Sequence, residues 1–173
     1  MKTEMHVARS LVVALLVFSV GACSAEDSGS SHGIEASVRI NDEATAEDVG
    51  LPAYPGSKLY KEPGESSSGA NVGLSTPLFG LKVAAVKLES ADEPEQVARF
   101  YRKALSKYGD LLDCSDGAAT TEKASEGLKC DPTDSDEHRI VYKVGTKNNQ
   151  RIVAIKPHGK GARFDLVHVS IRD

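Results

Sequence analysis

The sequence contains no tryptophan, and aromatic residues make up only 5% of its 173 residues. A folded domain of this chain must therefore build its core mainly from aliphatic side chains. A basic excess is also missing, since 21 Lys and Arg stand against 25 Asp and Glu. Proteins dedicated to nucleic acids usually carry a strongly basic domain, so this balance argues against a nucleic-acid partner.

Residues 34–173 contain no recognised motif of catalysis or cofactor binding. Ser75 in "GLSTP" (73–77) lacks the second glycine of a G-x-S-x-G nucleophile elbow, and "PHGKG" (157–161) lacks the spacing of a phosphate-binding P-loop. The aspartates of "CDPTDSDEH" (130–138) do not follow the order of an EF-hand. We expect no catalytic residue, no metal and no cofactor, and hence a non-enzymatic binding or accessory protein. The alternative is a hydrolase or other enzyme whose site combines residues far apart in the sequence.

The chain has no apolar run long enough to cross a bilayer. The longest one, residues 11–20, is about half of the roughly 20 residues that a spanning helix needs. Lys2 and Arg9 precede the run, and small residues follow it, which is typical of a secretory signal. The ending Val20-Gly21-Ala22-Cys23 resembles the lipobox of bacterial lipoproteins.

This resemblance implies cleavage between Ala22 and Cys23. It also implies a diacylglycerol on the Cys23 thiol and a fatty acid such as palmitate on the new amino group. Ser24, in place of an aspartate, resembles an outer-membrane signal. The protein is therefore expected to be exported and anchored to the membrane through Cys23, at the periplasmic face of the outer membrane. An ordinary signal peptide with an incidental cysteine is the alternative.

Two cysteines remain besides the anchor, Cys114 and Cys130. An even pair in an exported chain predicts a disulfide, because export leads to an oxidising compartment. A metal site would need two further ligands, and His138 with nearby acids offers no recognised spacing.

The clearest predicted element is a helix over residues 92–109. Apolar side chains recur along one of its faces at helical spacing. They are Val97, Phe100, Tyr101, Ala104, Leu105 and Tyr108. Asp92 or Glu93 can cap the start of this helix, and Gly109 can end it.

Strand patterns lie on both sides of this helix in the sequence. They cover residues 34–40, 71–89 as two strands around Pro77, 109–114, 127–130, 138–145, 150–156 and 162–171. Thr45, Asp48 and Gly50 indicate one capped helical turn. This order predicts an α+β fold, a mostly antiparallel sheet with one long amphipathic helix packed on it and a minor N-terminal helical turn. We expect a signal peptide (1–22), a lipidated flexible tether (23–33) and a single domain (34–173).

Residues 162–171 carry apolar side chains of both parities. Phe164 and Leu166 point one way, and Val167, Val169 and Ile171 point the other. We therefore expect both faces of this strand to be covered, one by the helix and the other by residues 34–60.

Basic residues gather after His138, whereas acidic residues gather in 109–137. These charges can simply screen each other in the fold. Alternatively, the basic strands bind an anionic envelope ligand or lipid headgroups. Alternation with Ile140 and Tyr142 predicts that Arg139 and Lys143 point outward. Arg151 and Lys156 complete this candidate binding set, although their parity places them on opposite faces.

Several stretches together resemble a family of uncharacterised exported bacterial proteins. The shared motifs are a YPG turn (54–56), an FYR helix (100–102), a cysteine after that helix, and the run "KVGTKNNQRIVAIKP" (143–157). The resemblance covers about residues 45–171 and implies one coherent domain. It implies no activity, ligand or catalytic residue.

Overall fold

The computed structural model describes residues 36–41, 43–115, 127–131, 134 and 138–173. All of them belong to one compact unit, Gly33–Asp173. Its strands are β1 (Ser37–Asn41), β2 (Lys58–Leu59), β3 (Gly69–Ser75), β4 (Gly80–Ser90), β5 (Leu112–Asp113), β6 (Ile140–Thr146), β7 (Asn149–His158) and β8 (Gly161–Arg172). The α-helices are α1 (Ala46–Val49) and α2 (Pro94–Leu105).

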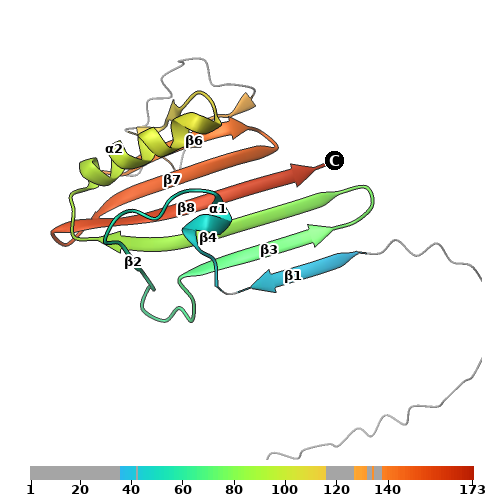
Figure 1. Cartoon of the computed structure of the whole chain (residues 1–173), viewed down its shortest axis with the longest axis horizontal. Helices are drawn as coiled ribbons and strands as arrows, with labels where there is room; N and C mark the ends of the chain where they lie inside the picture. The colour runs from blue at the N-terminus through green and yellow to red at the C-terminus, as the bar shows by residue number, and fades with distance from the viewer. Residues whose placement is uncertain (1–35, 42, 116–126, 132–133, 135–137) are drawn as a thin grey trace, which may run out of the picture. The chain divides into compact units, whose positions relative to one another are not determined.

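The strands form one eight-stranded sheet in the order β1-β3-β4-β8-β7-β6-β5, with β2 paired to β4 (Figure 1). Every strand pair is antiparallel. β4 and β8 are the longest pair and lie side by side at the centre, although more than 70 residues of sequence separate them. Within the described part of the chain, β1 and β5 are the two edges.

The predicted fold class, with one long amphipathic helix packed on the sheet, is wrong. α2 has only 12 residues, and the chain then tightens into a three-residue 3-10 turn, η1 (Ser106–Tyr108). At 1.5 Å per residue α2 is about 18 Å long, whereas the 12 residues of β8 extend about 40 Å. The periodic pattern over 92–109 included capping residues and the 3-10 turn. The fold is mainly an eight-stranded antiparallel sheet with two short helices.

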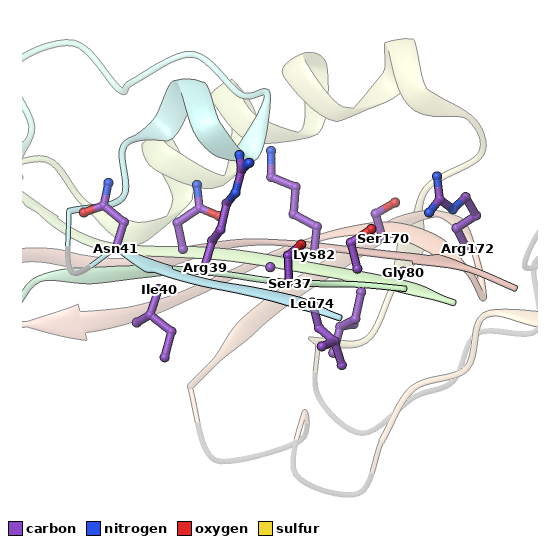
Figure 2. Close-up of a pocket in the computed structure, with 13 residues that line it drawn as sticks. Ser37, Arg39, Ile40, Asn41, Leu74, Gly80, Lys82, Ser170 and Arg172 are labelled. Carbon is purple, nitrogen blue, oxygen red and sulfur yellow. The ribbon is translucent and has the colours of Figure 1, made fainter. Parts of the chain in front are cut away.

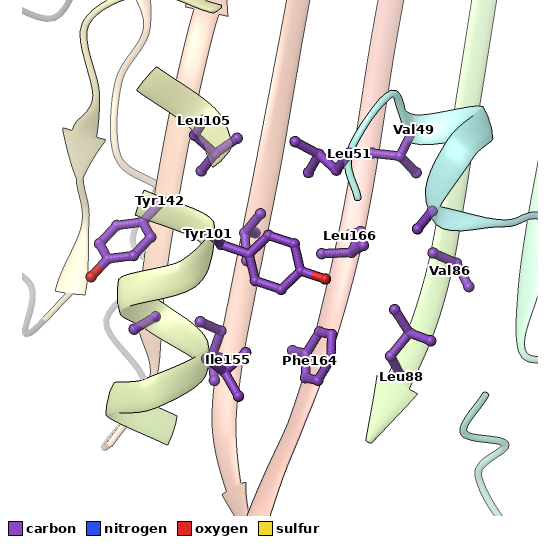
Figure 3. Close-up of a cluster of buried hydrophobic side chains, with 14 of the residues drawn as sticks. Val49, Leu51, Val86, Leu88, Tyr101, Leu105, Tyr142, Ile155, Phe164 and Leu166 are labelled. Carbon is purple, nitrogen blue, oxygen red and sulfur yellow. The ribbon is translucent and has the colours of Figure 1, made fainter. Parts of the chain in front are cut away.

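The main core lies between the sheet and the segments on its helical side. Tyr101 and Leu105 of α2 are fully buried, and the Tyr101 ring lies 5.6 Å from that of Phe164 on β8 (Figure 3). The Tyr101 hydroxyl donates to the carbonyl of Pro52, which satisfies its polar end. Burial raises the pKa of Tyr101 well above its ordinary value. Aliphatic residues fill most of the remaining space, as the scarcity of aromatic residues indicated.

The capped turn predicted from Thr45, Asp48 and Gly50 is present as α1. The Thr45 hydroxyl accepts from the Asp48 amide, and the Asp48 side chain accepts from the Thr45 amide. Gly50 ends the turn at φ 78°, a left-handed conformation that suits glycine. Val49 is buried in the core beside the sheet.

The segment containing α1 packs in the same core as α2, contrary to expectation. Val49 and Leu51 share a cluster with Leu166 and Tyr101, so residues 43–57 do not cover the second face of β8 (Figure 3). Residues 127–130 were predicted as a strand, but no strand forms there. Leu128 instead packs with Leu112 and Val141 in a small second cluster on the face away from α2. That cluster covers β5 to β7, and no described helix covers the same face of β1, β3 and β4.

Candidate functional site

A hollow of about 780 Å³ lies over strands β1, β3, β4 and β8. We call its side chains on the helical side of the sheet the basic shelf: Ser37, Arg39, Asn41, Asn71, Ser75, Lys82, Ser170 and Arg172. Figure 2 shows that Arg39, Asn41, Lys82 and Arg172 project to one side, while Ile40 and Leu74 project to the other.

Strand register explains how distant residues meet on this shelf. Arg39 is opposite Gly73, Gly73 is opposite Lys82, and Lys82 is opposite Ser170. Arg39 and Lys82 therefore stand two strand spacings apart, about 10 Å at their backbones. Gly73 lies between them and has no side chain, so the hollow reaches down to the backbone of β3 at this point. In the adjacent row Ser37, Ser75, Gly80 and Arg172 are opposite one another, again with small residues beside a cation.

The shelf is positively charged. Among the described residues no carboxylate forms an ion pair with Arg39, Lys82 or Arg172. Arg172 donates to the Thr76 carbonyl at 3.4 Å. Asp48 at the α1 end is held by its own capping box: hydrogen bonds from Thr45 lower the pKa of Asp48, and Lys82 adds a smaller effect. Among the described residues, the three cations thus face Asp48, an acid that is already engaged in its capping box.

Neutral hydrogen-bonding groups surround these cations. The Asn71 amide donates to Asp48 at 3.5 Å, whereas no hydrogen bond with a described residue engages the side chains of Ser37, Ser75 and Ser170. In the described part of the shelf no serine is hydrogen-bonded to a histidine, lysine or carboxylate base. The arrangement can bind an anion together with hydroxyl groups, and it lacks the nucleophile-base pair of covalent catalysis.

Sequence reasoning did not select Arg39, Lys82 or Arg172. Arg39 and Lys82 alternate with aliphatic residues in their strands, as in "VRI" and "LKV", and Arg172 follows Ile171 at the end of β8. That alternation indicates a polar face, but it does not indicate which strands are neighbours. The pairing of β4 with β8 brings Lys82 and Arg172 together across about 90 residues of sequence.

Lys143 points away from the core that holds Tyr142 and Val144, as the alternation predicted, but it is buried there and does not lie on an exposed basic face. Its side chain is 3% exposed, and its ammonium group contacts Asp131 at 2.6 Å and Asp134 at 2.7 Å. It also donates to the Lys129 carbonyl at 3.2 Å. Burial lowers the pKa of Lys143, but the two carboxylates outweigh that effect and raise it overall.

The other three predicted binding residues do not form one surface. Arg139 lies 3.9 Å from Asp165 on the face away from α2. Arg151 lies on the α2 side, where it donates to the Val49 carbonyl at 3.0 Å and stacks on Tyr108 at 3.7 Å. Lys156 is exposed on β7. Among the described residues, Lys143 is the basic-strand cation that pairs with the acidic segment, through Asp131 and Asp134. This contact agrees with the simpler interpretation of the charge pattern, in which the two segments screen each other.

Cys114 and Cys130 form a disulfide, with their Cα atoms 5.4 Å apart. Asp134 lies near both sulfur atoms, but bonded cysteines offer no thiolate to a metal. The remaining predicted site residues, Ala22 and Cys23, lie outside the described residues. No described helix is both long enough and apolar enough to cross a membrane.

A second pocket of about 360 Å³ lies on the face away from α2, with Asp165 and Lys87 in its lining. One oxygen of Asp165 is buried without a hydrogen bond. Burial raises the pKa of Asp165, and Arg139, Arg163, Lys87 and Lys156 oppose this effect. A carboxyl with a raised pKa suits acid catalysis, but it is also what a buried charge network produces.

Comparison with known proteins identifies no family. No protein-family model and no curated protein matches the sequence. A crystal structure of LpqN, which is involved in cell envelope biogenesis of Mycobacterium tuberculosis, aligns at 14% identity over 80% of this chain and 73% of that chain. The TM-score is 0.27, so no property of LpqN is inferred for this chain.

Proposed function

We propose that this protein is an exported envelope lipoprotein, anchored through Cys23, that binds an anionic, hydroxyl-bearing envelope molecule on the basic shelf. One observation carries the proposal: Arg39, Lys82 and Arg172 surround a low floor of glycine and serine, and no ion pair with a described residue neutralises them. The protein acts as a binding component and performs no covalent chemistry there.

The chemistry of the shelf defines the class of ligand. Arginine and lysine bind carboxylate or phosphate, and arginine can do so with two parallel hydrogen bonds. Serine hydroxyls and asparagine amides between them match sugar or glycerol hydroxyls. The hollow is open, and its volume lies within the range of small-molecule sites. An acidic sugar or a glycerophosphate group satisfies all of these features.

The test is a titration of the mature, lipidated protein in detergent micelles with two soluble probes, glycerol phosphate and an oligoglucuronate. NMR amide shifts locate the contact, and calorimetry gives the affinity at low and high salt. Replacing Arg39 and Lys82 with glutamine should weaken binding at least tenfold. Binding should also weaken with salt, because exposed charges are screened over about 8 Å at physiological ionic strength.

Lys58 and Lys103 provide the matched control, since both are exposed and lie outside the shelf. Replacing this pair with glutamine removes the same net charge and should leave the affinity unchanged. If both double variants lose affinity equally, the interaction reflects net charge and the shelf is not the site. Binding of neither probe by the wild-type protein would also contradict the proposal.

A further inference from the structure

Exposed large apolar side chains gather at one corner of the sheet. Five such side chains are exposed among the described residues: Val38 (65%), Ile40 (70%), Leu59 (59%), Leu78 (82%) and Phe79 (37%). Four of them belong to β1 or to the turn between β3 and β4, and Leu59 lies on β2 near the other end of β4 (Figure 1). Contiguous exposed apolar surface in a water-soluble domain marks an interaction site.

The turn between β3 and β4 is held in a defined conformation. The Thr76 amide donates to the Phe79 carbonyl at 2.7 Å, and the Phe79 amide donates to the Thr76 hydroxyl at 2.9 Å. Leu78 is the most exposed of the five. The turn therefore presents its apolar residues without a further ordering cost.

A row of apolar side chains crosses the strands next to this turn. Val38 is opposite Leu74, Leu74 is opposite Leu81, and Leu81 is opposite Ile171, all on the face away from the basic shelf. Ile40 and Leu74 project to that side in Figure 2. This is the face that residues 34–60 were expected to cover, and β1 instead adds two exposed aliphatic side chains to it.

The position of the predicted lipid anchor indicates what this corner contacts. β1 begins at Ser37, and Ser37 is paired with Ser75, the last residue of β3 before the turn. Residues 24–36 separate Cys23 from β1, and even fully extended they reach no farther than about 45 Å. The chain therefore enters the domain next to its most apolar corner, and that corner is the part most closely tethered to the bilayer.

One cation completes the corner. Arg172 is opposite Gly80, directly after the turn, and it hydrogen-bonds to the Thr76 carbonyl. An exposed apolar group with an adjacent cation is the combination that suits the interface of a bilayer containing anionic lipid.

We propose that the Leu78-Phe79 turn and the exposed side chains of β1 insert into the interfacial layer of the bilayer that holds Cys23, with Arg172 at the level of the lipid phosphates. This second attachment rests on the anchor in the proposed function, and it does not depend on a ligand on the shelf. It fixes which end of the sheet faces the membrane.

The absence of tryptophan allows a direct test. A Leu78→Trp variant of the mature, lipidated protein carries a single tryptophan, and it is reconstituted into vesicles of phosphatidylcholine with 30% phosphatidylglycerol. Lipids brominated at different acyl positions report the depth of that tryptophan. The matched control is Leu59→Trp, because Leu59 is also an exposed leucine but pairs with Leu88 at the far end of β4.

Bromolipid should quench the tryptophan of the Leu78→Trp variant at least twofold more than that of the Leu59→Trp control. Emission of the Leu78→Trp variant should also be blue-shifted, and bromines near the headgroup should quench it most effectively. Equal quenching in the two variants would overturn the proposal. The emission at position 78 could instead be blue-shifted only at high protein density, without quenching by bromolipid. That result would show that the corner contacts a second copy of the protein, and it would also overturn the proposal. Flotation of the same vesicles tests separately whether Cys23 anchors the protein, and titration with glycerol phosphate tests ligand binding on the basic shelf. A failure of the anchor, of the shelf or of the inserted turn can therefore be distinguished from the other two.

Discussion

Reducing the Cys114–Cys130 disulfide should destabilise the domain substantially. The two cysteines are 16 residues apart, and in the chain-entropy model a bond that closes a loop of that length contributes about 3 kcal/mol to the free energy of unfolding. For a domain of this size the loss of that contribution corresponds to a fall in melting temperature of about 10 °C. Cys114 is buried among Leu112, Leu128 and Val141, so reduction also loosens the small second cluster.

The measurement is thermal unfolding followed by circular dichroism, with and without a thiol reductant. A variant with both Cys114 and Cys130 changed to serine is the control, since its melting temperature should not respond to reductant. It should resemble the reduced wild-type protein within a few degrees. If reduction shifts the wild-type melting temperature by less than about 2 °C, the loop is already constrained by other contacts and the entropic argument fails.

Two further predictions concern charges on the face away from α2. Lys143→Met should lower the free energy of unfolding by about 3 kcal/mol, because Asp134 loses its buried partner. Adding Asp134→Asn to this variant should recover part of the lost stability, and urea unfolding measures both values. Equal stability of the single and double variants would contradict the pairing. Asp165→Asn should stabilise the protein at neutral pH, because the ionised form of a carboxyl with a raised pKa is disfavoured in the folded state. This advantage should vanish below the ordinary aspartate pKa of 3.8, where Asp165 is protonated in both states, and a pH-independent difference would refute it.

Local patterns in the sequence predicted many of the secondary-structure elements, although the strand expected over 127–130 does not form. The capping box at Thr45 and Asp48 formed as predicted, since all of its partners lie within a few residues. The turn at Pro77 and the strands after residue 138 also follow alternation and turn residues. The helix was overestimated because its apolar pattern continues through Tyr108, while the backbone changes to a 3-10 turn after Leu105.

Contacts between residues far apart in the sequence could not be predicted from local patterns, and the candidate site depends on such contacts. Lys143 lies between the apolar residues Tyr142 and Val144, as an exposed lysine of a half-buried strand would, yet it is buried and paired with Asp131 and Asp134. Nothing within β6 indicates that the segment after Cys130 folds over this lysine. Arg39 and Lys82 look equally ordinary in sequence, and they face a shared hollow only because β3 places Gly73 between them. Charge counts along the sequence therefore did not select the three cations of the basic shelf.

Side chains along β1, β3, β4 and β8 alternate between the two faces of the sheet, so the same strands form a basic surface on one face and an apolar surface on the other. Even and odd residues of one strand point to opposite faces, so Arg39 belongs to the basic shelf while Val38 and Ile40 on either side belong to the apolar face. Arg172 stands where the two meet, beside the β3–β4 turn. If that turn contacts the bilayer, the shelf opens at the level of the headgroups. A ligand bound there would be one that the membrane surface presents, which accounts for cations and hydrogen-bonding groups in an open hollow instead of an enclosed cavity.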